Sequence, residues 1–95
     1  MTSRDEYVER FKKQLDEWNG SIDVLAAKAS QAHDDVKAKV GVHVAELRRQ
    51  HEAATERASE VRKASEDSWH ELKGGVETAK NALHESFKKA RAHFD

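Results

Sequence analysis

The six histidines are the residues of this chain that are best suited to bind a metal ion. Metal ligands on one helix must lie three or four residues apart to share a face. No two histidines are four residues apart, and the nearest approximations pair Glu66 with His70 and His43 with Glu46. A four-ligand site would need ligands from several helices, so a His-containing metal-binding bundle is our third interpretation and we assign no metal ligand. The histidines are His33, His43, His51, His70, His84 and His93.

Residues for nucleophilic chemistry are present without a recognisable arrangement. The chain contains serines, histidines and carboxylates, but it lacks a nucleophile elbow, a glycine-rich phosphate loop and a His-Glu-x-x-His motif. Cysteine is absent, which removes thiolate catalysis, disulfides and cysteine metal sites together. We therefore predict no catalytic residue and no cofactor, and we expect a protein that is not an enzyme.

The composition predicts helices and little else. Charged residues make up 37% of the 95 residues, proline is absent and glycine occurs four times, which is typical of long helices or coiled coils. The 17 basic and 18 acidic residues are interspersed, with a net charge of −1. Nucleic-acid binding needs a concentrated basic patch, so nucleic acid is not an expected partner.

The first expected helix runs from about residue 4 to residue 64. Ser3 and Glu6 have the spacing of a capping box, which predicts a helix start there. Apolar residues then recur every three or four positions in one stripe, and the stripe continues past Gly20 and past Gly41 with a single change of step near Val40. A turn near Gly41 is the alternative, because Lys37, Lys39 and Gly41 are typical of a helix end. The stripe comprises Val8, Phe11, Leu15, Trp18, Ile22, Leu25, Ala29, Ala32, Val36, Val40, Leu47, Ala54, Ala58 and Val61, and His51 lies near it where leucine would be usual.

The second expected helix runs from about residue 67 to residue 94. Ser68 and Glu71 again have capping-box spacing. Gly74 and Gly75 fall inside good periodicity, so we interpret them as internal to the helix. Its face is the most strongly apolar in the chain, with Trp69, Leu72, Val76, Ala79, Leu83, Phe87, Ala90 and Phe94.

The two helices differ greatly in length, roughly 90 Å against roughly 40 Å at 1.5 Å per residue. In an antiparallel coiled-coil hairpin the short helix leaves the N-terminal aromatic stripe uncovered, and an exposed stripe of that size indicates an interface. We therefore predict one helical coiled-coil domain over residues 1–95 that assembles as a homodimeric bundle. The alternative is a monomeric three-helix bundle with its extra turn near Gly41. The predicted interface residues are Tyr7, Phe11, Leu15, Trp18, Ile22, Leu25, Trp69, Leu72, Val76, Leu83, Phe87 and Phe94.

A membrane surface is the second interpretation of the C-terminal helix. Basic residues surround its apolar face, as in helices that lie on anionic lipid. They are Lys73, Lys80, Lys88, Lys89 and Arg91. No apolar leader segment follows the N-terminal residues 1–6, so we expect no secretory signal and a cytoplasmic location.

Two tryptophan segments carry a family resemblance. Residues 4–8 through 14–19, and residues 64–69 through 72–77, resemble small bacterial coiled-coil stress-response proteins, an apolipoprotein-like family typified by a cyanobacterial member. The resemblance covers most of the chain and implies an intracellular, stress-linked role without a catalytic residue. We therefore expect a non-enzymatic interaction protein that acts through helix-helix self-assembly, with client proteins as further partners.

Overall fold

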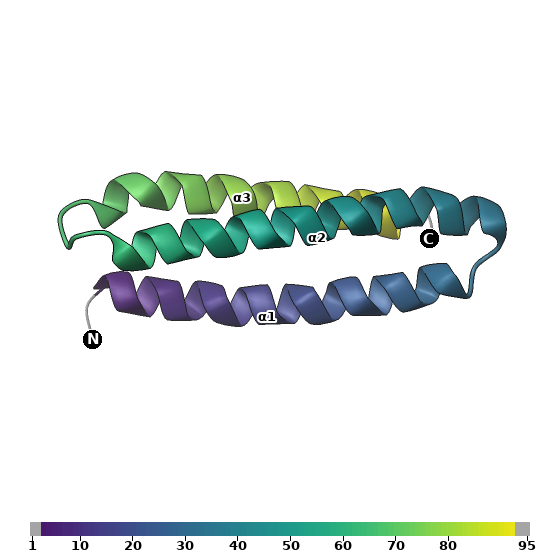
Figure 1. The fold of residues 1–95 in the computed structure, drawn as a ribbon, viewed down its shortest axis with the longest axis horizontal. Helices are drawn as coiled ribbons and strands as arrows, with labels where there is room; N and C mark the ends of the chain where they lie inside the picture. The colour runs from purple at the N-terminus through teal and green to yellow at the C-terminus, as the bar shows by residue number, and fades with distance from the viewer. Residues whose placement is uncertain (1–2, 93–95) are drawn as a thin grey trace.

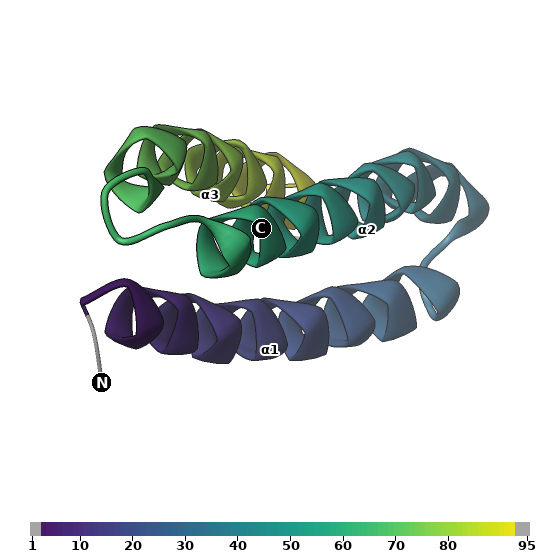
Figure 2. The same cartoon turned by 60° about the vertical axis from the view of Figure 1, so that its left-hand side comes forward.

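Three helices of comparable length make up the protein. The computed structural model describes residues 3–92, which form α1 (Ser3–Ser30), α2 (Asp34–Lys63) and α3 (Trp69–Arg91). The helices run up, down and up, so that α2 is antiparallel to both α1 and α3 (Figure 1). Helix α2 packs along its length against both of the others, and α1 and α3 lie on different sides of it (Figures 1 and 2). The all-helical fold class is confirmed.

The predicted unbroken helix over residues 4–64 is wrong, because the chain turns at residues 31–33. Helix α1 ends in two backbone hydrogen bonds between residues three positions apart. They run from Gln31 N to Lys28 O and from Ala32 N to Ala29 O, and both are 3.2 Å long. His33 is extended, with φ −60° and ψ 154°. The longest dimension is 51 Å, far short of the roughly 90 Å of the predicted helix. The aromatic stripe is therefore folded back onto its own chain.

Charge favours a break at this turn. Lys28 lies in the last turn of α1, and Asp34 and Asp35 lie in the first turn of α2. Each charge opposes the partial charge of the helix end beside it, and such contacts typically stabilise a helix end by about 0.3–1 kcal/mol. The Ser30 hydroxyl also donates a hydrogen bond of 2.8 Å to the carbonyl of Ala27, which supplies part of the C-terminal capping of α1.

The glycines do not interrupt the helices. Gly20 lies within α1, Gly41 within α2, and Gly74 and Gly75 within α3. The interpretation of Gly41 as internal to a helix is confirmed, and the alternative turn near Gly41 is wrong. No glycine of the described residues has a positive φ, so none is required for its backbone conformation.

The predicted start of the last helix is confirmed, but its predicted capping box does not form. Helix α3 begins at Trp69, and the side chain of the N-cap residue Ser68 caps no backbone N–H. Ser65 takes that role instead: its hydroxyl oxygen accepts from Ser68 N at 3.2 Å, and its carbonyl accepts from Trp69 N at 3.2 Å. Residues 93–95, at the expected end of this helix, lie outside the described residues.

Hydrogen bonds between helices fix the antiparallel register of α1 and α2. The Arg4 guanidinium donates to the carbonyl of Ala64, the residue that follows α2, and Arg48 donates to Asp23 at 3.0 Å. Between them, His51 Nε2 lies 2.8 Å from the carbonyl oxygen of Leu15, so this nitrogen must carry the proton. His51 therefore replaces the expected apolar seam residue with a polar link across the helix pair.

The core is a continuous apolar layer contributed by all three helices. It contains no buried polar or charged residue among those described. Ile22, Val40, Leu47, Val61, Val76 and Leu83 are its largest side chains with essentially no exposure. None of the helices within residues 3–92 combines the length and hydrophobicity that crossing a bilayer requires.

Candidate functional site

Most of the predicted interface residues form the interior of a single chain. Eight of the twelve are buried, namely Phe11, Leu15, Ile22, Leu25, Trp69, Val76, Leu83 and Phe87. Tyr7 and Trp18 are partly buried and pack against this core, whereas Leu72 is exposed. Phe94 lies outside the described residues. The stripes that were expected to meet across two chains therefore meet within one.

On the side of the bundle where α1 and α3 face each other, an aromatic cluster closes one end of the space between them. The Tyr7 hydroxyl on α1 donates a 2.9 Å hydrogen bond to the Glu77 carboxylate on α3. The Tyr7 ring lies 5.7 Å from the Trp69 ring, and the Lys73 ammonium lies 5.2 Å from the Tyr7 ring centroid. Burial, followed by the hydrogen bond and charge of Glu77, raises the pKa of Tyr7 well above its usual value. The phenol therefore stays protonated and keeps its hydrogen bond at physiological pH.

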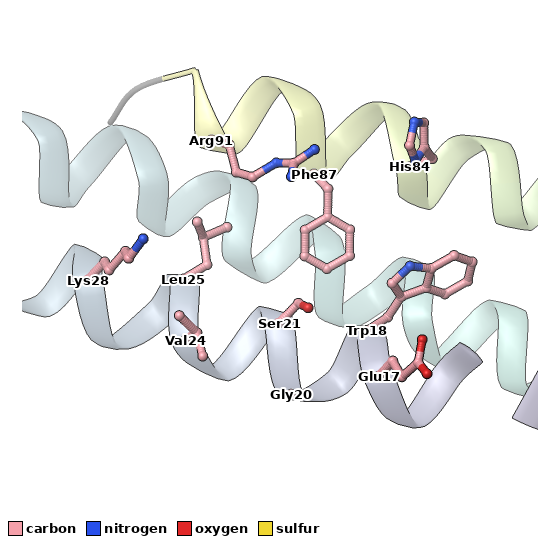
Figure 3. A pocket seen from close by; sticks show the side chains of 10 residues that line it. All are labelled: Glu17, Trp18, Gly20, Ser21, Val24, Leu25, Lys28, His84, Phe87 and Arg91. Atoms are coloured by element: carbon pink, nitrogen blue, oxygen red, sulfur yellow. The ribbon is translucent and has the colours of Figure 1, made fainter. Parts of the chain in front are cut away.

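Further along, the same side opens into a groove of about 690 Å³ between α1 and α3 (Figure 3). Trp18, Val24, Leu25 and Phe87 supply its apolar lining. The remaining lining residues are Glu17, Gly20, Ser21, Lys28, His84 and Arg91. Trp18 is held in place by Phe11, whose ring it meets edge-on at 6.2 Å.

Small and exposed residues form part of the α1 wall of the groove. Gly20 and Ser21 line it at the level between Trp18 and Val24. A Cβ atom added to Gly20 would meet no atom within 4 Å. Val24 is 57% exposed, a high value for a valine beside an apolar lining. The groove is therefore a surface at which apolar side chains remain accessible.

A second hollow of about 390 Å³ continues the groove towards the aromatic cluster. Glu17 borders both hollows, and the second one is otherwise lined by Tyr7, Arg10, Phe11, Lys13, Gln14, Glu77 and Lys80. We call the two hollows together the α1/α3 groove. It follows α1 from Tyr7 to Lys28, which is nearly the full length of that helix.

The residue pairs closest to metal-ligand spacing are engaged in other contacts. The Glu66 carboxylate lies 3.8 Å from the Arg4 guanidinium, and the His70 ring lies 3.9 Å from the Trp69 ring. Glu46 accepts hydrogen bonds from Arg49 and from Gln50. In the part of the chain that the structure describes, no three His or acidic side chains are grouped so that they could hold a metal ion.

Sequence reasoning missed the groove, although a weak signal for it exists. Val24 falls off the main apolar stripe of α1, and with Trp18, Ser21 and Lys28 it marks a second face beside that stripe at helical spacing. The opposite wall repeats this spacing with His84, Phe87 and Arg91 on α3. A face that is only half apolar is hard to distinguish from ordinary helix surface until the neighbouring helix is placed.

Comparison of the chain with protein-family models, with curated proteins and with solved structures finds no match. The resemblance to the bacterial stress-response family stays a prediction from the two tryptophan segments.

Proposed function

We propose that this protein is a non-enzymatic interaction protein that binds a fourth helix in the α1/α3 groove. The single observation that supports this proposal is the apolar groove of about 690 Å³, which leaves Trp18 and Val24 accessible beside a closed core. Amphipathic helices bind proteins by laying an apolar face into a groove of this kind. A fourth helix over α1 and α3 would complete a four-helix bundle, which is a stable way to cover apolar helix faces.

Trp18 is the aromatic side chain of the larger hollow that is suited to anchoring such a helix. Binding energy at protein interfaces is concentrated in a few residues, often aromatic ones, that become fully covered on binding. Trp18 on the α1 wall is only partly buried, so a bound helix can cover it further, whereas Phe87 on the opposite wall is already buried (Figure 3). The association with stress, the bacterial source and the cytoplasmic location belong to the proposal through the resemblance alone.

Self-assembly through the aromatic stripes is the form of helix binding that the sequence predicts. The reason for that prediction was an uncovered stripe, and in the structure the stripe is covered by α2 and α3. A homodimer stays a prediction, but the uncovered apolar surface that a second copy could cover is now the groove.

Binding to a membrane surface through α3 is less well supported than helix binding. The apolar residues Trp69, Val76, Leu83 and Phe87 of α3 are buried against the rest of the chain. They could reach lipid only if α3 left the bundle, which would expose the core of α1 and α2 to water. The membrane alternative therefore requires opening of the fold, whereas helix binding does not.

A charged residue in the groove should abolish helix binding. The probes are two fluorescently labelled, designed amphipathic peptides of about 20 residues, which span about 30 Å as helices. They share one apolar face, and their polar faces carry glutamate in one peptide and lysine in the other. Val24→Asp places a carboxylate against the bound apolar face, where it would lose water. We expect the dissociation constant of the tighter peptide to rise at least about tenfold in a fluorescence anisotropy titration.

Val42→Asp is the matched control for Val24→Asp. Val42 is the other strongly exposed valine, at 71%, and it lies on α2 away from the groove. We expect the dissociation constant of the peptide for the Val42→Asp variant to stay within about twofold of its value for the parent protein. Failure of both peptides to bind the parent protein, or an equal loss in both variants, would contradict the proposed function.

A further inference from the structure

We infer that the helix bound in the α1/α3 groove carries acidic residues on its polar face and comes from a different protein. This inference rests on the proposed function and concerns the charge of the groove. Five of the chain's 17 basic residues line the groove, against two of its 18 acidic residues. The chain as a whole has a net charge of −1, so positive charge is concentrated on this side. The five basic residues are Arg10, Lys13, Lys28, Lys80 and Arg91.

The arginines of the groove differ from several arginines elsewhere in their pairing. Arg4, Arg48, Arg49 and Arg57 each form an ion pair with a carboxylate of the same chain. Arg10 and Arg91 form none with any described residue, and the same is true of Arg62 outside the groove. One of the two groove carboxylates, Glu77, already accepts the Tyr7 hydroxyl. The groove thus offers cationic groups without enough carboxylates of its own to neutralise them.

The positions of these charges favour one orientation of the bound helix. Lys28 and Arg91 lie in the last turns of α1 and α3, at the same end of the groove (Figure 3). A fourth helix antiparallel to α1 and α3 would continue the up-down alternation and place its first turn beside these two side chains. Acidic residues are favoured in the first turn of a helix by its own dipole. Lys28 and Arg91 would add to that preference.

The same charges disfavour a second copy of this chain as the occupant. Two copies that meet through their grooves would bring ten lysine and arginine side chains together against four glutamates. Like charges that face each other across an interface repel, and this repulsion weakens binding between the two copies. A partner of complementary charge avoids this repulsion and gains faster association.

The test compares the glutamate peptide with the lysine peptide. For the parent protein at low ionic strength, we expect the glutamate peptide to bind at least about tenfold more tightly, with a difference that shrinks as salt is added. The double variant K28E/R91E should lose this preference or reverse it. The double variant K88E/K89E is the matched control, because it changes the net charge equally at exposed α3 positions outside the groove. It should keep the preference.

The possible results separate this inference from the proposed function. Equal binding of both peptides, with loss in Val24→Asp, would overturn the acidic partner and leave helix binding intact. A loss of preference in K88E/K89E as large as in K28E/R91E would also overturn it, because the attraction would then be unspecific. A doubled mass by light scattering that Val24→Asp abolishes would identify a second copy as the occupant and overturn the inference. Binding of neither peptide would overturn the proposed function as well.

Discussion

Gly41→Pro is expected to destabilise the protein severely, whereas Asp34→Pro is expected to be tolerated. Gly41 lies in the interior of α2, seven residues after its start. A proline there removes a backbone hydrogen bond and its ring clashes with the preceding turn, which costs about 3 kcal/mol or more. For a chain of this size, that loss corresponds to a fall in melting temperature of roughly 12 °C or more.

The environment of Asp34 differs from that of Gly41, although the two residues are only seven positions apart. It is the first residue of α2, where proline is common because the N–H group has no partner within the helix. His33 already has the extended conformation that a residue before proline adopts. The charge of Asp34 at the helix start is lost, so we expect a net change within about 1 kcal/mol.

Thermal unfolding of the two proline variants distinguishes the three candidate topologies. One continuous helix over residues 4–64 would make both variants severely destabilised. A turn near Gly41 would make Gly41→Pro mild and Asp34→Pro severe. Only a turn at residues 31–33 gives a mild Asp34→Pro together with a severe Gly41→Pro, and the opposite order would contradict the structure.

Leu47→Ala should cost about 2–5 kcal/mol of unfolding free energy. Leu47 is completely buried and lies on α2, the helix that packs against both α1 and α3. Removing its side chain leaves a cavity in the apolar layer to which all three helices contribute. Small domains have only about 5–15 kcal/mol of stability in total, so this one change should remove a large part of it.

Leu72→Ala is the matched control for Leu47→Ala. Leu72 lies on α3 and is 37% exposed, although the sequence placed it on the same apolar stripe as the buried residues of that helix. We expect a loss below about 1 kcal/mol in urea or guanidinium unfolding. Equal losses at Leu47 and Leu72 would mean that the core is not where the structure places it.

The sequence was sufficient to predict the helical class and the buried stripe. The three-and-four spacing from Val8 to Leu25, and again from Trp69 to Phe87, depends only on which face of a helix is apolar. Burial of these residues inside the bundle follows that pattern closely. The position of Gly41 inside a helix was also predictable, because the residues after it offer no cap for a new helix.

The turn at residues 31–33 could not be read from hydrophobic periodicity. Ala29, Ala32 and Val36 keep the helical spacing straight across the break, and alanine tolerates a helix so well that it gives no stop signal. The informative signals were electrostatic, with Lys28 before the turn and Asp34 and Asp35 after it. The length mismatch of the two predicted helices also favoured a further turn, since helices of 28, 30 and 23 residues can cover one another within one chain.

The groove was less predictable than the fold, because it depends on the spacing between α1 and α3. Val24 and Lys28 look like ordinary surface residues in the sequence. The sequence indicates Arg91 only as one of several basic residues around the last helix. These residues line one groove only because the folded chain brings α1 and α3 together, although the two helices are far apart in the sequence.

The folding of α1 onto α2 within one chain is tested most directly by a single intramolecular distance. Spin labels at the exposed positions Glu6 and Lys63, measured by pulsed electron paramagnetic resonance with excess unlabelled protein present, report only on pairs within one molecule. Arg4 hydrogen-bonds to Ala64, so we expect a short separation on the scale of the bundle's 19 Å width plus the label linkers. A separation of roughly 85 Å, as along one continuous helix, would contradict the fold and with it the α1/α3 groove.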